Sequence, residues 1–222
     1  MPLLSVIVPA YNEESNIPTL VEKVAKALSG IDYELIIIDD GSIDNTTEVA
    51  KKFEGKHPIR VFRHEHNKGK IEALKTGLQA ARGEFIAFLD ADMEYPPEAL
   101  PTMLQKAMQG HDLVAAIRVD GRPFYRRIVS SGARCLAKLL ISKLRKYKDP
   151  TTEMILTKRD LILQMNLKNY IKPFIPILLA AKNPAEVKIQ LNYRTGGESS
   201  FRLKWILNYL YELLDLHVRG GR

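Results

Sequence analysis

Five short apolar segments alternate with helical patterns over the first half of the 222-residue chain, and this alternation restricts the fold more than any other feature. Continuous apolar runs rich in β-branched residues are typical of strands that are buried on both faces of a parallel sheet. The runs lie at residues 3–9, 33–39, 59–63, 85–90 and 113–117, and helical patterns lie at 17–28, 46–53 and 70–81. This order predicts an α/β fold built on a doubly wound sheet with right-handed crossovers.

The composition is that of a globular protein, with 45% hydrophobic and 27% charged residues, which excludes a disordered or fibrous chain. Cys135 is the single cysteine, so an internal disulfide and a thiolate metal site are excluded, and we expect it to pack as a small apolar group. The first residues read as a strand, not a signal peptide. No uncharged apolar run reaches the roughly 18 residues of a membrane span. We therefore expect one intracellular domain over residues 1–222.

Charge is distributed unevenly along the chain. Residues 1–117 carry a net charge of −6, whereas residues 118–148 hold ten Lys or Arg and one acidic residue. Such a basic segment attracts the phosphates of nucleotides, lipids or nucleic acids. The acidic first half, together with the lack of aromatic residues interleaved in the basic segment, argues against a nucleic-acid partner.

Two amphipathic helices are predicted in the second half, at residues 124–147 and 201–218. The second has an apolar face too wide for casual exposure, so it must cover the core, a partner or a membrane surface. Its aromatic residues Trp205, Tyr209 and Tyr211 are of the kind that favours membrane interfaces. With the basic segment, this predicts docking on an anionic membrane face without spanning it; the competing interpretation is that both helices simply pack on the sheet.

Polar and acidic motifs follow the predicted strands. The first strand runs into Pro9-Ala10-Tyr11-Asn12-Glu13, which lacks glycine and so differs from a dinucleotide-binding turn, but can stack on and hydrogen-bond a base. The second strand ends in Asp39-Asp40-Gly41-Ser42 and the fourth in Asp90-Ala91-Asp92-Met93-Glu94. In an extended segment Asp90, Asp92 and Glu94 point the same way, and three such oxygen ligands suit Mg²⁺ or Mn²⁺.

These motifs, together with Asn67-Lys68-Gly69-Lys70, resemble those of family 2 glycosyltransferases with a GT-A (Rossmann-like) fold. The branch most similar is that of the dolichyl-phosphate or polyprenyl-phosphate mannose or glucose synthases. The second half adds Arg118, Arg126-Arg127, Asp149-Pro150-Thr151-Thr152 and Arg194 with Gly197-Glu198-Ser199, which look like the phosphate-binding, acceptor-loop and C-terminal motifs of that branch. The chain departs from the pattern at Ile71 and Ser200, where glycine and lysine are common, and at Glu153-Met154, where Gly-Phe is usual.

The resemblance implies an inverting, metal-dependent transfer of a hexose from a nucleoside-diphosphate sugar, such as GDP-mannose or UDP-glucose, to a polyprenyl or dolichyl phosphate. It implies that residues 1–117 bind the nucleotide sugar and metal, and that residues 118–222 bind the acceptor. Nucleotide-binding positions would be Pro9, Tyr11, Glu13, Asp40, Lys70, Asp90 and Ala91, and the metal ligands Asp90, Asp92 and Glu94. Catalytic positions would be Asp92, Arg118 and Arg127, and acceptor-phosphate ligands Arg127, Ser131 and Arg194, because a guanidinium binds phosphate with two parallel hydrogen bonds.

Two other interpretations of the site stay open. A GT-A enzyme acting on a sugar hydroxyl would need a general base, and Glu153 is the candidate. A non-catalytic module that binds a nucleotide sugar or an anionic membrane is the second alternative, against which the Asp90, Asp92 and Glu94 set argues. His64 and His66 flank Glu65 and suggest a metal pair, but we favour a loop of solvated histidines.

Overall fold

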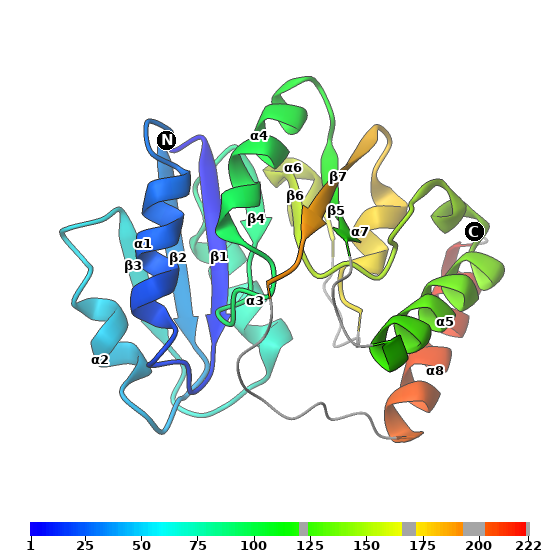
Figure 1. Ribbon diagram of the computed structural model, residues 1–222, viewed down its shortest axis with the longest axis horizontal. Coiled ribbons are helices and arrows are strands. Elements are labelled where there is room, and N and C mark those ends of the chain that lie inside the picture. The colour runs from blue at the N-terminus through cyan, green and yellow to red at the C-terminus, as the bar shows by residue number, and fades with distance from the viewer. Residues whose placement is uncertain (120–123, 166–171, 193–202, 221–222) are drawn as a thin grey trace.

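Within the described residues, a seven-stranded sheet forms the centre of the protein, in the order β3-β2-β1-β4-β6-β5-β7 (Figure 1). The structure is a computed structural model that describes residues 1–119, 124–165, 172–192 and 203–220. The strands are β1 (Leu4–Ala10), β2 (Tyr33–Asp39), β3 (Ile59–Arg63), β4 (Phe85–Phe88), β5 (Leu113–Val119), β6 (Ile155–Lys158) and β7 (Pro184–Gln190).

Helices connect these strands and cover the sheet. The α-helices are α1 (Ile17–Ala27), α2 (Thr46–Lys51), α3 (Lys70–Ala80), α4 (Leu100–Met108), α5 (Phe124–Leu140), α6 (Arg159–Leu163), α7 (Ile175–Ala180) and α8 (Leu203–Gly220), and two short 3₁₀ helices are η1 (Pro97–Ala99) and η2 (Ser142–Lys146). Side chains are described from residue 129 on in α5 and over residues 208–218 in α8.

The first four predicted strands pair in parallel, as their buried apolar runs require, whereas the fifth, β5, pairs in parallel with β7, a strand that was not predicted. β1 pairs with β2 and with β4, β2 pairs with β3, and β5 pairs with β7, all in parallel. The doubly wound α/β prediction is correct for these strands but incomplete, because β6 runs antiparallel between β4 and β5. β6 was missed because it is only four residues long, so its pattern is too short to separate from a loop.

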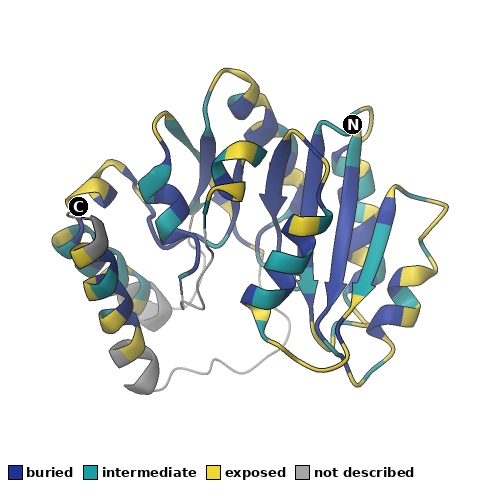
Figure 2. Cartoon of the chain, turned by 180° about the vertical axis from the view of Figure 1, so that it is seen from behind, coloured by how far each residue is buried: buried dark blue, intermediate teal, exposed yellow. Residues whose placement is uncertain are grey.

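Two apolar layers sandwich the sheet, and its central strands are coloured as buried in Figure 2. Alternate residues of β1 serve the two faces: Val6 packs in the layer under α1 and α4, and Ile7 packs in the layer under α3 and α7. The helices α5 and α8 extend the second layer beyond the strands, where Ala137 and Leu213 are buried in it. The sheet is therefore covered on both faces, which explains why its strands read as continuous apolar runs.

The basic helix predicted at 124–147 ends earlier than expected. α5 stops at Leu140, Ile141 adopts an extended backbone, and η2 follows. Ile141, Leu144 and Tyr147, in and beside this bend, are all buried in the core. Cys135 is exposed on α5, so the expectation that it packs as a buried apolar group is wrong.

Helices α5 and α8 pack side by side (Figure 1). The Tyr209 hydroxyl of α8 donates to the Ala133 carbonyl oxygen of α5 at 3.1 Å, and Nδ1 of His217 lies 2.6 Å from the Leu140 carbonyl oxygen. Tyr209 is thus buried, so its predicted role as a ring at a membrane interface is wrong, whereas Tyr211 is 71% exposed. Within the described ranges, no helix is long and apolar enough to span a bilayer.

Two helical glycines provide a matched test of how closely α3 packs on the sheet. A Cβ at Gly77 of α3 would lie 2.4 Å from Ile7 Cγ2 and 2.7 Å from Ile38 Cδ1, whereas one at Gly132 of α5 meets nothing within 4 Å. We expect Gly77→Ala to lower the free energy of unfolding by about 1–3 kcal/mol through overpacking. Gly132→Ala should raise it by up to about 1 kcal/mol through helix propensity. Urea denaturation measures both, and equal effects of the two changes would contradict the close packing of α3 on β1 and β2.

Candidate active site

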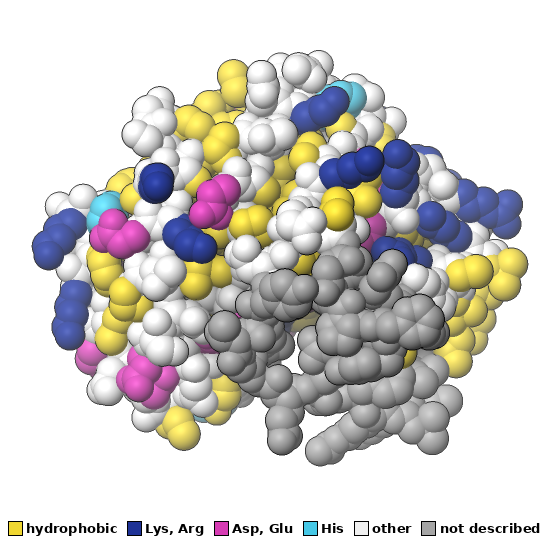
Figure 3. All heavy atoms as spheres, in the orientation of Figure 1, with side chains coloured by type: hydrophobic (Ala, Val, Ile, Leu, Met, Phe, Trp, Pro, Cys, Tyr) yellow, Lys and Arg dark blue, Asp and Glu magenta, His cyan; other side chains and the backbone are white. Residues whose placement is uncertain are grey.

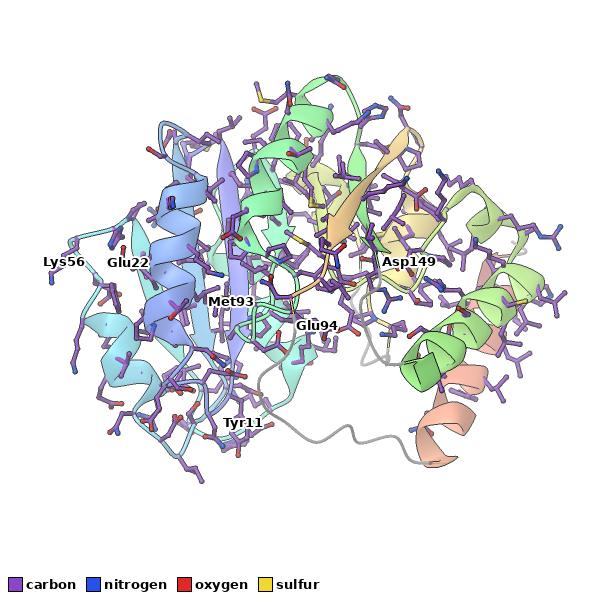
Figure 4. All side chains as sticks on the ribbon, in the orientation of Figure 1. Tyr11, Glu22, Lys56, Met93, Glu94 and Asp149 are labelled. Atoms are coloured by element: carbon purple, nitrogen blue, oxygen red, sulfur yellow. The ribbon has the colours of Figure 1, made fainter. Side chains whose placement is uncertain are left out.

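The carboxyl ends of β1, β2, β4, β5 and β7 meet at one edge of the sheet, because these strands run in the same direction. Three of the predicted motifs follow these ends: Tyr11 follows β1, Asp40 follows β2, and Asp90 follows β4. Figure 4 shows Tyr11, Glu94 and Asp149 spread along this edge. Ligands of open α/β sheets bind at such an edge, so it is the candidate active site.

The loops after β1 and β2 are held together by hydrogen bonds. The Asn12 amide donates to Ser42 Oγ at 2.9 Å, and the Ile43 amide donates back to Asn12 Oδ1 at 3.0 Å. Asn12 has a φ of 56°, a left-handed conformation that asparagine tolerates. Tyr11 is left 44% exposed at this turn, as stacking on a base requires. The roles of Pro9, Tyr11 and Glu13 in a nucleoside pocket stay predictions.

Asp40 is buried and holds the loop that precedes α3. Its Oδ1 accepts the Lys68 amide at 2.9 Å and lies 2.6 Å from His64 Nδ1, and its Oδ2 accepts the Gly69 amide at 2.7 Å. These contacts give Asp40 a positioning role and do not support its predicted binding of a base or ribose. His64 is 8% exposed and also contacts Thr76 Oγ1, so the prediction of a solvated histidine is wrong for His64. His66 is exposed, as predicted.

The acidic segment after β4 forms a turn. The Met93 amide donates to the Asp90 carbonyl oxygen at 3.2 Å, and Met93 has a left-handed φ of 52°. The Asn192 side-chain amide donates to the Met93 carbonyl oxygen at 3.0 Å, which fixes the turn from the end of β7. Side chains two residues apart in a turn do not share a direction. Among the described residues, no three acidic, His or Cys side chains gather as a metal site, so the expected convergence of Asp90, Asp92 and Glu94 is not found.

The Asp90 carboxylate instead begins a chain of alternating charges. Lys70 Nζ lies 2.7 Å from Asp90 Oδ1 and 3.1 Å from Glu153 Oε2, and Lys172 Nζ lies 2.5 Å from Glu153 Oε1. These four side chains come from the start of α3, the end of β4, the segment before β6 and the segment before α7. Burial raises the pKa of Asp90; Lys70 opposes this increase, and the nearby Glu153 carboxylate adds to it.

Glu153 is poorly suited to act as a general base. Burial alone would raise the pKa of its carboxyl group, but attraction to Lys172 and Lys70 outweighs this and lowers the pKa well below its usual range. Each carboxylate oxygen also accepts a hydrogen bond from a lysine. A base works best with a pKa near the operating pH and with access to the proton that it removes. The geometry therefore disfavours the alternative in which Glu153 activates a sugar hydroxyl.

Arg118 forms a buried ion pair at the end of β5. Its Nε and Nη2 donate to the two oxygens of Asp149 at 2.6 and 2.8 Å, and Nη2 also donates to Thr151 Oγ1 at 2.6 Å. The Arg118 side chain is 7% exposed and Asp149 is fully buried. Burial would raise the pKa of Asp149, but hydrogen bonds and charge from Arg118 lower it below its usual value. Arg118 thus organises the segment before β6, and its predicted catalytic role is not supported by these contacts.

The other predicted acceptor ligands are placed only in part. Ser131 is exposed on α5, where its Oγ accepts a hydrogen bond from Arg134 Nη2 at 2.8 Å. The backbone of Arg127 lies in α5, but its side chain falls outside the described ones, and Arg194 lies outside the described residues altogether. Their proposed binding of phosphate stays a prediction.

The structure also brings in residues that the sequence motifs did not indicate. Lys172 and Asn192 follow no recognisable motif; only the tertiary fold brings Lys172 to Glu153 and Asn192 to the acidic turn. Tyr95 is buried beneath it, where burial raises the pKa of its hydroxyl to about 12, and that hydroxyl accepts the Glu153 amide at 3.3 Å. One signal was available for Glu153, since it replaces the residue usual at its place in the enzymes that the chain resembles.

Comparison with known proteins identifies the family. Residues 5–170 match the family described as "Glycosyl transferase family 2", and the chain belongs to this family. The chain is 31% identical over 222 residues to a dolichol-phosphate mannosyltransferase of Pyrococcus furiosus, covering 96% of this chain and 63% of that protein. It is 32% identical to an undecaprenyl-phosphate 4-deoxy-4-formamido-L-arabinose transferase of Aeromonas hydrophila, covering 96% and 67%. The chain thus spans about two thirds of the length of these relatives.

Solved structures confirm the GT-A fold class. Glucosyl-3-phosphoglycerate synthase of Mycobacterium tuberculosis, in complex with Mn²⁺, UDP and glucosyl-3-phosphoglycerate, superposes with a TM-score of 0.78 at 23% identity, covering 99% of this chain and 80% of that one. The same enzyme with Mg²⁺ and UDP superposes with a TM-score of 0.74. The predicted fold and family are therefore both confirmed.

The buried pair of Arg118 and Asp149 predicts a large effect on stability. Asp149→Asn leaves a buried guanidinium without its counter-charge, so we expect the free energy of unfolding at pH 7 to fall by about 3–5 kcal/mol. Because the folded pKa of Asp149 is lowered, its contribution is present above the ordinary carboxyl pKa and is lost as the pH falls through the folded value. The difference between wild type and variant should therefore shrink in acid.

Urea denaturation at several pH values measures this difference. Asp160→Asn is the matched control, since Asp160 is exposed on α6 and the change should stay within about 0.5 kcal/mol. If Asp149→Asn is as stable as the control variant, the pair does not organise the segment before β6.

Proposed function

We propose that this chain is a metal-dependent, inverting glycosyltransferase that moves a hexose, mannose or glucose, from a nucleoside-diphosphate sugar to a polyprenyl phosphate. One observation carries the proposal: a single edge of the sheet brings together an exposed aromatic turn at Tyr11, the carboxylates of the turn after β4, and the ammonium groups of Lys70 and Lys172. Such a set suits a base, a cation and a diphosphate side by side. Both named relatives carry a polyprenyl phosphate in their names, although their sugars differ.

Glu153 is poorly suited to act as a general base, and a phosphate acceptor does not need one. A phosphomonoester has a second pKa of about 6, so its oxygen is largely ionised near pH 7 and needs no proton removed. In the proposed step this oxygen attacks the anomeric carbon while the bond to the nucleoside diphosphate breaks, which inverts the configuration. Cationic side chains then stabilise the negative charge that develops on the departing diphosphate.

Asp90 and Asp92 fit the divalent ion, Mg²⁺ or Mn²⁺, that this reaction class uses. Their carboxylate oxygens are the hard ligands that both ions prefer. Asp90 already faces a cation, since the Lys70 ammonium group lies 2.7 Å from Oδ1. When bound, the ion would supply positive charge beside the diphosphate. Glu94, two residues beyond Asp92, is the third ligand in this proposal.

A substitution at Asp92 tests the metal assignment. Asp92 Oδ1 accepts the Glu94 amide at 3.1 Å, and asparagine keeps this acceptor while it removes the charge. We expect Asp92→Asn to fold normally and to lose at least about 100-fold in turnover. Mass spectrometry of the product formed from polyprenyl phosphate with GDP-mannose or UDP-glucose and Mn²⁺ gives the measurement and the sugar. Asp160→Asn should retain turnover.

Two results would overturn parts of this function. Normal turnover of Asp92→Asn at saturating Mn²⁺ would remove Asp92 from the metal site. Transfer to a hydroxyl acceptor but never to a phosphate would replace the lipid acceptor with a sugar.

We also propose that the α5–α8 pair docks on an anionic membrane face. Apolar side chains point outward from both helices: Leu139 is 69% exposed, Leu214 51% and Val218 68%. Lys143, Arg145, Lys146 and Lys148 are exposed on and beside η2, which follows α5. Lys and Arg side chains gather on this side of the molecule in Figure 3. Apolar area and basic charge are the two signals that interfacial binding combines.

Flotation with liposomes checks this docking. Binding should rise with the anionic lipid fraction and weaken with salt, because the basic side chains are exposed to solvent. Leu139→Asp should reduce the bound fraction severalfold, since it places a charge in the apolar contact. Leu163→Asp is the matched control, because Leu163 is an exposed leucine on α6, away from the α5–α8 pair. Equal flotation of the two variants, or no binding at low salt, would contradict the docking.

A further inference from the structure

We propose that Lys70 and Lys172 form a phosphate-binding pair, and that the Glu153 carboxylate is an internal anion which occupies this pair until a substrate phosphate displaces it. The inference rests on the proposed function and extends it by adding Lys172 as a phosphate ligand and Glu153 as a competitor for the same place.

The geometry is that of an anion held between two cations. Glu153 Oε2 lies 3.1 Å from Lys70 Nζ, and Oε1 lies 2.5 Å from Lys172 Nζ. Each ammonium group thus contacts a different oxygen of the same carboxylate. A phosphate group offers the same kind of acceptor oxygens with more charge, and lysine binds phosphate as a point charge with three donors.

The side chains at this place are unequally exposed to solvent. The Glu153 side chain is 33% exposed and that of Lys70 is 38% exposed, whereas that of Lys172 is 12% exposed. Glu153 and Lys70 are thus partly accessible to solvent, whereas Lys172 is largely enclosed. An ion pair that is exposed to this degree contributes little to the stability of the fold, because solvent weakens the attraction between the charges.

The position in the fold ties this pair to the substrate. Lys70 also contacts Asp90, the carboxylate proposed to hold the metal beside the diphosphate. Among the predicted phosphate ligands with described side chains, Arg118 is engaged by Asp149, and Ser131 accepts a bond from Arg134. Lys70 and Lys172 meet instead at Glu153, where each is paired with carboxylates of the protein.

Glu153 also makes the place selective by charge. With Lys70, Lys172 and Asp90 it gives four alternating charges that cancel. A singly charged anion that replaces the Glu153 carboxylate gains little additional attraction to the two lysines, whereas a phosphate with a charge near −2 gains more. The pair therefore discriminates in favour of phosphate over carboxylates and halides.

Metal-free binding of two probes tests the proposal without any turnover. Pyrophosphate represents the donor diphosphate, and geranyl monophosphate represents the lipid phosphate. Calorimetry should show that Glu153→Gln binds one of them about tenfold more tightly than wild type, because the internal competitor is gone. Lys172→Met in the Glu153→Gln background should remove this gain. The probe that gains affinity identifies which substrate phosphate uses the pair.

A matched control separates this effect from a general change of charge. Glu72→Gln removes a carboxylate that pairs with Lys75 at 2.8 Å on the same helix α3, and it should leave both affinities unchanged. Should Glu153→Gln fail to fold, Glu153→Gly places there the residue usual in the enzymes that the chain resembles and serves the same comparison.

The outcomes are distinct. Unchanged or weaker binding of both probes by folded Glu153 variants overturns the inference, and so does a gain that persists in the Lys172→Met background. An affinity gain in a protein that transfers no sugar would keep the phosphate pair and overturn the proposed function. Normal sugar transfer by the protein, with no affinity gain in its Glu153 variants, would keep the proposed function and overturn the phosphate pair.

Discussion

The parallel pairing of β1 with β2 and β4 is the constraint on which the rest of the candidate site depends. Its register sets Ala10 beside Asp39, so that the turn after β1 and the loop after β2 start side by side. On its other side β1 pairs with β4 and sets Ile7 beside Phe88. This pairing brings the acidic turn, which follows β4, to the same edge of the sheet. A slip of this register by one residue would exchange the two faces of β1 and disperse the motifs. The apolar core and the site are therefore fixed by the same hydrogen-bond ladder.

Buried carboxylates then convert this edge into a rigid frame. Asp39 accepts the Ser42 amide, and Asp40 accepts the amides of Lys68 and Gly69, so two loops fold around two acidic side chains. At the other side of the edge Asp149 does the same for Arg118. Each of these acids is satisfied by several donors, which is the condition under which a buried charge is stable. Rigid loops of this kind hold functional groups in place at little entropic cost on binding.

The sequence predicted the first strands and the motifs that follow them well, because each of these features depends on a pattern of neighbouring residues. The apolar runs at β1 and β2 and the polar turns that follow them need no knowledge of distant contacts. The prediction of the site was wrong where the direction of the side chains mattered. The segment with Asp90, Asp92 and Glu94 was treated as extended, but Met93 takes a left-handed conformation and the chain turns. Acidic residues that hold loops, such as Asp40, also look in the sequence like residues that bind ligands.

Lys172 shows why the remainder could not be predicted. It lies 102 positions beyond Lys70 and follows no motif, yet both lysines reach Glu153. Only the packing of the segments before β6 and α7 against α3 brings them together, and such long-range placement leaves no periodic trace in the sequence. The same holds for Asn192, which fixes the Met93 turn from the end of β7.

Charge balance decides how such a site can bind. Lys70, Lys172 and Arg118 each already contact a carboxylate, so in the proposed function a substrate phosphate would exchange partners with an acid of the protein. The net gain is then the difference between two ion pairs, which is much smaller than either pair alone. Such an exchange would limit affinity for the ground state but would keep the lysines oriented before the substrate arrives. Positive charge that is already in place stabilises a departing diphosphate better than charge that must first be recruited, because no reorganisation is needed at the moment of reaction.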